Sequence, residues 1–511
     1  MEIENERKKY INFRPVVTIA AIFLTGILSA FLSLITVIGG KIVFSSVAVA
    51  IVLTVIFTFK RNKTLAVTLI TAFPLFIYGF SVPFIKISAN VSEKTSGVYE
   101  ISGEVVRADK VLKGVNGFEN TVVVSISGGE LDGKKLLVEL YSDSRADKGA
   151  TVKFSTYVRP LRYYDNGYLS VKNMKNGVTL KGNHAECEIT GYKTGVFDKT
   201  RILLRERLER GAGENYGFTY ALLTGDTNDI NESVLTAFRT NGLAHVFAVS
   251  GLHIGFLFGI IAAVCKIFKV KRFVKFFITV PVLFLYVAFC GFTASCMRAF
   301  LIITVAEAAA CTGMKNDKLS TLFLSMIIVL VVNPEDLFGV GFILSYSVYF
   351  GIVFLTPVIN KFLSRFILGG AAKFLSPLVA AYLSSLPVCA DMFGTTSVFS
   401  MFLNAIVISA VGVVFTVAFV CAVITLITGA NFPCAVSGIT SGALIKFVKS
   451  FEYLGGLKID FTFGISAFLY YGLLIFSCKF VNFSEKTDKI VSAGIFFAFI
   501  LTFTLVNCGL L

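Results

Sequence analysis

Two hydrophobic patterns alternate along the chain. Long, nearly unbroken apolar runs occupy residues 1–89 and 242–511, and such runs are typical of helices that cross a membrane. Between residues 90 and 195 these runs stop, and apolar residues alternate with polar ones at the period of a β-strand. Residues 196–241 are charged and amphipathic, which indicates helices at a membrane surface. The chain is therefore expected to be a polytopic α-helical membrane protein of about 10 to 12 spans with a small inserted all-β domain.

The first apolar segment, residues 1–89, predicts about three membrane helices. Their expected ranges are residues 16–38, 42–59 and 65–85. Basic residues lie before the first helix and again at residues 60–63. Because Lys and Arg concentrate in the cytoplasmic loops of membrane proteins, the N-terminus is expected in the cytoplasm. The segment 90–195 is then extracellular.

The extracellular segment reads as five short strands separated by glycine-containing turns. The expected strands are residues 98–107, 121–126, 135–141, 151–158, and 178–181 continued by 187–190. Five strands in about 100 residues fit a small closed barrel, and the OB-fold is the leading candidate. Such barrels often bind strands of nucleic acid through basic and aromatic side chains.

One stretch of this segment supplies both kinds of side chain. The candidates for DNA binding are Arg159, Arg162, Tyr163, Tyr164 and Lys172. An ordinary solvated loop explains the same residues equally well. Residues 90–200 hold 16 Lys or Arg against 14 Asp or Glu, so any electrostatic footprint has to be a local patch.

The sequence GLAHVFAVSGLHIGFLF, residues 242–258, is the most informative apolar run. It contains His245, Ser250 and His253, and such groups are costly in hydrocarbon unless they are partnered or face water. Ser250 and His253 share a helical face, and Ser250–Gly251 is a plausible break in the helix. One interpretation is a helix that packs through its glycines around buried histidines. The other is a functional membrane helix whose polar face borders a cavity.

Six further spans follow, each alternating in direction. Their expected ranges are residues 243–268, 274–290, 298–311, 322–332, 340–356 and 374–392. Residues 397–428 are too long for one ordinary span and short for two, so the topology beyond them stays open. Four polar residues stand in or beside these spans, namely Arg298, Glu307, Asp391 and Asn404. A lone Arg at a helix end often snorkels to the interface, but in a pore its forked donors suit a phosphate.

Composition supports the membrane class and narrows the chemistry. Apolar residues make up 55% of the 511 positions and charged residues 15%, which excludes an ordinary soluble enzyme. The net charge of +15 is weak evidence for an anionic ligand, since cytoplasmic loops are basic in any case. Of the ten cysteines, only Cys187 falls in the extracellular segment, so that segment has no internal disulfide. No metal site and no cofactor are expected.

Several motifs together resemble the ComEC family of competence proteins. LLTGDTNDI at residues 222–230 is followed by FRTNGLAHVFAVSGLHIG at 238–255, and this pair is long and specific. Later pieces agree: GFTASCMRAF (291–300), NPEDLFGVGFILSYSVYFGI (333–352) and LPVCADMFGTTSVFSMFLNAIVI (386–408). The resemblance extends from about residue 20 to about residue 430. The resemblance implies a structural role within the family motifs for five residues, namely Gly225, Asp226, Gly255, Gly341 and Ser345.

The resemblance implies an inner-membrane channel for DNA uptake in natural transformation. The expected lining residues are Ser250, Gly251, His253, His245, Arg298 and Asn404. The implied partners are DNA, the membrane, a separate nuclease, a DNA-receptor protein and a cytoplasmic helicase or ATPase, and a homo-oligomer is left open. Two departures stand out. The chain resembles the form without the C-terminal metallo-β-lactamase-like domain, and the residues after Asn404 lack the proline that the family tends to have there.

Three functions therefore compete at this stage. The first is a channel that carries DNA, expected to be a single strand, across the cytoplasmic membrane. The second is a membrane hydrolase with Ser250 as nucleophile and His253 as base, although no third, orienting residue is evident. The third is a transporter of another polyanion or of a lipid-linked substrate. Because no two-metal nuclease motif is present, the chain is not expected to be an enzyme.

Overall fold

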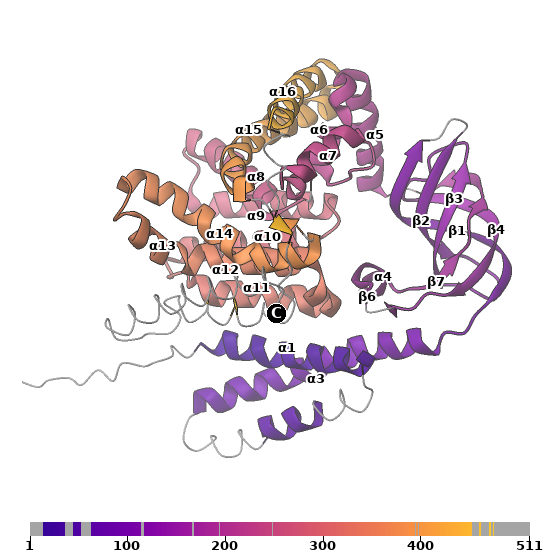
Figure 1. Ribbon diagram of the computed structural model, residues 1–511, viewed down its shortest axis with the longest axis horizontal. Helices are drawn as coiled ribbons and strands as arrows, with labels where there is room; N and C mark the ends of the chain where they lie inside the picture. The colour runs from indigo at the N-terminus through magenta and orange to yellow at the C-terminus, as the bar shows by residue number, and fades with distance from the viewer. Residues whose placement is uncertain are drawn as a thin grey trace, which may run out of the picture.

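Helices and one β domain make up the protein in a computed structural model (Figure 1). The structure describes residues 14–474. Within that range it leaves out residues 36–43, 53–62, 114–116, 166–167, 194, 248, 394, 397, 452–458, 461–469 and 472–473. The predicted spans beyond residue 475 therefore lie outside the described residues. The class of fold predicted from the sequence, mostly helical with a small sheet near the N-terminal end, is confirmed.

Two long apolar helices open the fold. Helix α1 (Pro15–Ile35) and helix α3 (Lys63–Ser92) pack along one another, and residues 44–52 between them are helical. Phe23 and Phe76 are fully buried in this layer, and the backbone of Phe76 lies so close to Gly26 that a side chain there would clash. Figure 1 shows α1 and α3 as a separate layer beneath the other helices, leading into the sheet.

The β domain follows α3 directly. Its main strands are β1 (Gly97–Lys113), β2 (Phe118–Ile126), β3 (Lys135–Ser142), β4 (Ala150–Pro160), β7 (Val178–Gly182) and β9 (Glu188–Tyr192). Shorter elements are β5 (Tyr164–Asp165), β6 (Tyr168–Leu169), α4 (Val171–Asn176) and β8 (Ala185–Glu186). Each expected strand is present, and most are longer than the sequence pattern indicated.

Pairing between these strands closes on itself. The order runs β1-β2-β3-β7-β4, and β4 pairs back with β1, while β3 and β7 are parallel. Alternate residues of β3 and β4 point inward, as the period-two pattern requires. The interior is filled by branched side chains such as Val105, Val124 and Leu140, which form one hydrophobic cluster.

A charged helix connects the β domain to the remaining helices. Helix α5 (Val196–Gly211) buries Leu204 and Leu208 and presents its arginines elsewhere, as its amphipathic sequence predicts. It is followed by η1 (Gly213–Asn215), α6 (Tyr216–Thr224), α7 (Glu232–Thr240) and η2 (Ala244–Val246). Asn231 caps α7 by accepting a hydrogen bond from the Ser233 N–H, as expected for an N-cap residue.

The remaining helices form the largest body of the protein. They are α8 (Gly251–Ile267), α9 (Arg272–Phe289), α10 (Ala294–Thr312), α11 (Lys318–Val332), η3 (Pro334–Phe338), α12 (Val340–Phe354), α13 (Thr356–Leu363), α14 (Gly369–Phe393), α15 (Val398–Thr428) and α16 (Phe432–Lys449). The two-residue strands β10 (Thr395–Thr396) and β11 (Ile459–Asp460) pair beside them. The segment 397–428, whose topology was open, is almost entirely one helix of 31 residues.

Among the described residues, five helices are long and apolar enough to cross a membrane, or six if the bent pair α12 and α13 is one span. This is consistent with a multi-pass membrane protein. Many apolar side chains on these helices are exposed, including Phe277, Leu285 and Val413, which is consistent with a lipid-facing surface. Glu307 pairs with Lys275 of α9 at 2.9 Å, so the charge inside α10 is matched by a neighbouring helix.

Candidate functional site

The stretch 242–258 does not form one continuous helix. A single turn, η2, ends at Val246, and α8 begins only at Gly251. The Ser250 hydroxyl accepts a hydrogen bond from the Leu252 N–H at 3.2 Å, and the Nδ1 atom of His253 accepts one from the Ser250 N–H at 3.2 Å. This reciprocal arrangement is a capping box in which a histidine takes the place usually held by glutamate. The predicted break at Ser250–Gly251 is therefore present.

Arg298 of α10 lies against this helix start. Its Nε atom donates a hydrogen bond to the Ser345 hydroxyl of α12 at 2.5 Å, and its guanidinium lies 5.3 Å from the centre of the Tyr349 ring. An ideal Cβ atom on Gly251 would lie 2.8 Å from the Nη2 atom of Arg298. Glycine at position 251 therefore lets the guanidinium approach the first turn of α8.

Two serines complete this group. The Ser295 hydroxyl accepts a hydrogen bond from the Gly251 N–H at 3.3 Å and lies 3.1 Å from the Ser345 hydroxyl. Ser250, Gly251, Ser295, Arg298 and Ser345 are called the Arg298 cluster below. They come from the starts of α8 and α10 and from the second turn of α12, so three separate helices build one polar group inside an apolar body.

The electrostatics of the Arg298 cluster are one-sided. The start of α8 carries the positive end of the helix dipole, and the guanidinium adds a full positive charge beside it. Among the described residues, no carboxylate lies within ion-pair distance of Arg298, whereas Lys275 has its Glu307. A positive charge that is largely enclosed and has no acid beside it is stabilised by an anion. The arrangement suits the binding of a phosphate group.

The other expected lining residues, His253, His245 and Asn404, are not part of the Arg298 cluster. His253 is 1% exposed, and its ring packs edge-on against Phe415 of α15. His245 is exposed and belongs to η2, so it does not share a helix with His253 of α8. Asn404 lies on α15, and its buried Oδ1 atom accepts no hydrogen bond from the described residues. The structure brings Ser250, Gly251 and Arg298 together, and it gives His253 a packing and capping position.

The motif glycines have separate environments. Gly225 ends α6 with φ of +81°, and a side chain there would meet Val249 at 2.5 Å. Position 225 therefore favours glycine for two reasons: the backbone is in the left-handed conformation, and Val249 leaves no room for a side chain. Gly255 and Gly341 have open space where a Cβ atom would stand, so neither is needed for helix packing against the described residues.

A charged cleft of about 560 Å³ lies where the β domain meets α5 and the motif at 222–230. Its basic lining residues are Arg107, Lys148, Lys172, Arg201 and Arg205, and its acidic ones are Asp109, Asp147, Asp198 and Asp226. Sequence reasoning missed this cleft because its residues come from distant segments. The one available signal was Arg201 and Arg205, which are four residues apart on α5 and so share a face.

Arg145 connects the β domain to this motif. Its Nε atom lies 2.7 Å from Asp147, and its Nη1 atom pairs with Asp229. Burial lowers the pKa of the Arg145 guanidinium, but Asp147 and Asp229 outweigh that effect and raise it above its ordinary value. Burial raises the pKa of the nearby Asp226 carboxyl, which the Asn228 N–H and Arg145 lower only in part. The motif is therefore held to the β domain by partly buried ion pairs.

Most of the proposed DNA-binding residues of the β domain have other partners. Tyr163 is 3% exposed, and burial raises the pKa of its hydroxyl to about 12, so its ring offers no face to a base. Arg162 donates to the carbonyl oxygens of Asn90 and Val91 at the end of α3. Lys172 pairs with Asp109 at 2.7 Å. These contacts speak against DNA binding by Tyr163 and Arg162, whereas the Lys172 side chain stays 63% exposed beside Asp109, and Arg159 is exposed as well. The side chain of Tyr164 lies outside the described residues.

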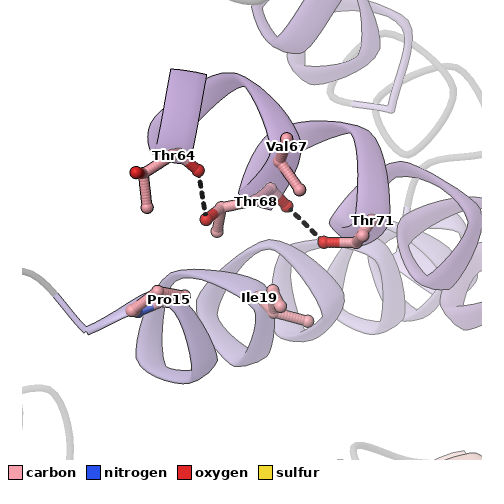
Figure 2. Close-up of a pocket in the computed structure, with 6 residues that line it drawn as sticks. All are labelled: Pro15, Ile19, Thr64, Val67, Thr68 and Thr71. Carbon is pink, nitrogen blue, oxygen red and sulfur yellow. Dashed lines mark hydrogen bonds between the residues drawn. The ribbon is translucent and has the colours of Figure 1, made fainter. Parts of the chain in front are cut away.

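A second cavity of about 430 Å³ lies between α1 and α3 (Figure 2). Its lining is mainly apolar, with Pro15, Ile19 and Val67 among three threonines. Thr68 and Thr71 each donate a hydrogen bond to a carbonyl oxygen of their own helix, at 2.7 and 2.9 Å. Since these hydroxyls are already satisfied by the backbone, the cavity has little to offer a polar ligand.

A family model described as "Competence protein" matches residues 222–482, just over half of the chain. ComE operon protein 3 of Bacillus subtilis (strain 168) is 28% identical over 195 residues, which are 38% of this chain and 24% of that protein. The matched part therefore covers about a quarter of the relative. No solved structure matches the chain.

Proposed function

Because the chain belongs to the competence protein family, we propose that it carries DNA across the cytoplasmic membrane during natural transformation. The family points to a role in DNA uptake, and the resemblance includes the motifs at 222–230 and 238–255. The proposed form of transport is a path through the helices for a single strand. The N-terminus then lies in the cytoplasm and the β domain outside.

The single observation that carries this proposal is that Arg298 has no acidic partner among the residues that the structure describes. DNA has one phosphate charge per nucleotide, and a path for it needs cationic or hydrogen-bonding groups that release each phosphate again. One partly buried arginine, two serine hydroxyls and a helix start supply that chemistry without a tight cage. A path for apolar or cationic cargo has no use for an enclosed guanidinium beside the positive end of a helix.

The β domain and the charged cleft are the proposed approach to this path. The closed strand order β1-β2-β3-β7-β4, with β3 parallel to β7, supports an OB-like barrel. The cleft joins the barrel to the motif that precedes α8 and exposes Lys148 and Lys172. A strand guided by these cations would arrive next to the start of the bundle. In this account Arg159 remains the outer candidate for DNA contact.

A hydrolase is the weaker proposal. The Ser250 hydroxyl lies 3.3 Å from the Nδ1 atom of His253, which is near enough for a nucleophile and its base. However, that nitrogen also accepts the Ser250 N–H, and the hydroxyl oxygen accepts the Leu252 N–H, so both groups serve the helix cap. Among the described residues, no carboxylate orients the other ring nitrogen. We therefore propose that strand degradation, where it accompanies uptake, belongs to a separate nuclease.

The test is deletion of this gene in a naturally transformable host. We expect the deletion strain to bind labelled DNA at its surface as well as the wild type, because a receptor precedes the channel. DNA protected from added DNase should fall to background, and the intact gene in trans should restore it. Protected DNA at the wild-type level would contradict the channel and favour transport of another polyanion or of a lipid-linked substrate.

A further inference from the structure

Three side chains that commonly bind metal ions meet on the outer surface of the β domain. They are Glu119 of β2, Glu139 of β3 and His184, which directly precedes β8. One donor atom from each lies within 4.8 Å of the other two, and the Nδ1 atom of His184 is 3.5 Å from a carboxylate oxygen of Glu139. None of these residues has a part in the proposed DNA path.

Strand pairing explains why the three converge. Antiparallel pairing sets Thr121 opposite Glu139 and Glu119 opposite Tyr141, so the two glutamates are diagonal neighbours. Parallel pairing of Leu140 with Ala185 brings His184 beside Glu139. Leu140 and Ala185 point into the barrel, so their neighbours Glu139 and His184 point outward. Strands β2 and β3, with the residue that leads directly into β8, fix the spacing of the donors.

The charge balance of this surface favours a cation. Two carboxylates this close repel one another, and Glu186 adds a third exposed acid opposite Tyr141. Two other glutamates of the domain have lysine partners: Glu93 pairs with Lys134 at 2.8 Å, and Glu100 with Lys153 at 3.0 Å. Within the described residues, neither Glu119 nor Glu139 has a Lys or Arg partner. The group paired with Glu139 is the imidazole of His184, which is itself a metal ligand.

We propose that Glu119, Glu139 and His184 bind one divalent transition-metal ion of the zinc class. One imidazole nitrogen with two carboxylate oxygens suits Zn²⁺ and its neighbours, whereas Mg²⁺ and Ca²⁺ prefer oxygen donors throughout. Bonds of about 2.1 Å place tetrahedral ligand atoms about 3.4 Å apart, and rotation of these exposed side chains closes the remaining distance. All three donors approach from the barrel, so water completes the coordination on the open side.

The experiment measures Zn²⁺ binding to the full chain in detergent after removal of any histidine tag. A chromogenic zinc indicator competes for the ion, and we expect one site that millimolar Mg²⁺ does not displace. Glu119→Gln, Glu139→Gln and His184→Gln should each weaken binding at least tenfold, since even the loss of an outer-shell partner costs about 10- to 100-fold. Each variant should keep the wild-type thermal midpoint without metal, because all three side chains are exposed.

Two matched variants separate this site from other sources of binding. Glu186→Gln removes an exposed carboxylate from the same surface and should change the affinity less than twofold. Cys187→Ser removes the half-buried thiol of the domain, which packs against the barrel interior, and should leave the site intact. Wild-type affinity in His184→Gln overturns the proposal, as does loss of the site in Cys187→Ser. Displacement of Zn²⁺ by an equal concentration of Mg²⁺ also overturns the proposal, because it would indicate diffuse attraction of cations to acidic groups.

Discussion

Replacing Arg298 with alanine is expected to reduce DNase-protected DNA at least about 100-fold while the protein stays at its normal level in the membrane. The guanidinium is the one full charge in the Arg298 cluster, and charge-assisted hydrogen bonds are worth about 1.5–3 kcal/mol each. Losing about 2.7 kcal/mol at a step through which every nucleotide passes corresponds to about a 100-fold slower passage. The measurement is uptake of end-labelled DNA together with quantitation of the protein in isolated membranes.

Three further variants sharpen this prediction. Arg298→Lys keeps the charge but not the forked donors, so we expect partial uptake. Gly251→Ala removes no charge, yet its Cβ atom would lie 2.8 Å from Nη2, so it should displace the guanidinium and reduce uptake too. Arg272→Ala, at the exposed start of α9, is the matched control and should be neutral. Normal transformation by an Arg298→Ala strain would remove the cluster from the path.

Replacing Gly217 with alanine is expected to destabilise the folded protein strongly. An ideal Cβ atom at this buried position in α6 would stand 1.8 Å from the carbonyl oxygen of Asp229 and 2.5 Å from its carbonyl carbon. Both partners are backbone, and the segment around Asp229 is fixed by Arg145, so neither can move aside cheaply. We expect about 3 kcal/mol or more of destabilisation, the upper part of the range for overpacking.

The same substitution at Gly259 is the control. That glycine lies inside α8 with open space where a Cβ atom would be, so alanine should be tolerated and should favour the helix by up to about 1 kcal/mol. The measurement is the fraction of full-length protein that is monodisperse in detergent, with its thermal midpoint. A Gly217→Ala protein with the wild-type midpoint would mean that α6 and the 222–230 motif do not pack as described.

Local patterns predicted the elements of this fold well. The strands of the β domain were predictable because apolar and polar residues alternate along segments such as 135–141, and this pattern can be read from consecutive residues alone. Their ends were less certain: β1 extends to Lys113, six residues beyond the expected end, because pairing with β2 continues through two register shifts. The break before Gly251 was also readable, since Ser250 and Gly251 interrupt the apolar run.

Burial of individual polar residues was not predictable from the chain alone. Tyr163 looked like a stacking residue beside basic neighbours, yet it packs with Met174, Ile87 and Leu330, which come from three other elements. Arg162 looked like a phosphate ligand but caps the end of α3. The pairing of Glu307 with Lys275 needed the packing of α9 on α10. In each case the partner is distant in sequence, so no local pattern identifies it.

Photo-cross-linking from position 345 tests the central claim most directly. A photoactivatable amino acid in place of Ser345 would stand beside Arg298, and one in place of Val264, on an exposed face of the same bundle, serves as the reference. Cells are illuminated while labelled DNA is being taken up, and the protein is examined for attached label. A DNA path past the Arg298 cluster predicts a cross-link from position 345 and none from position 264. Label at position 345 no higher than at position 264, in cells that take up DNA normally, would contradict it.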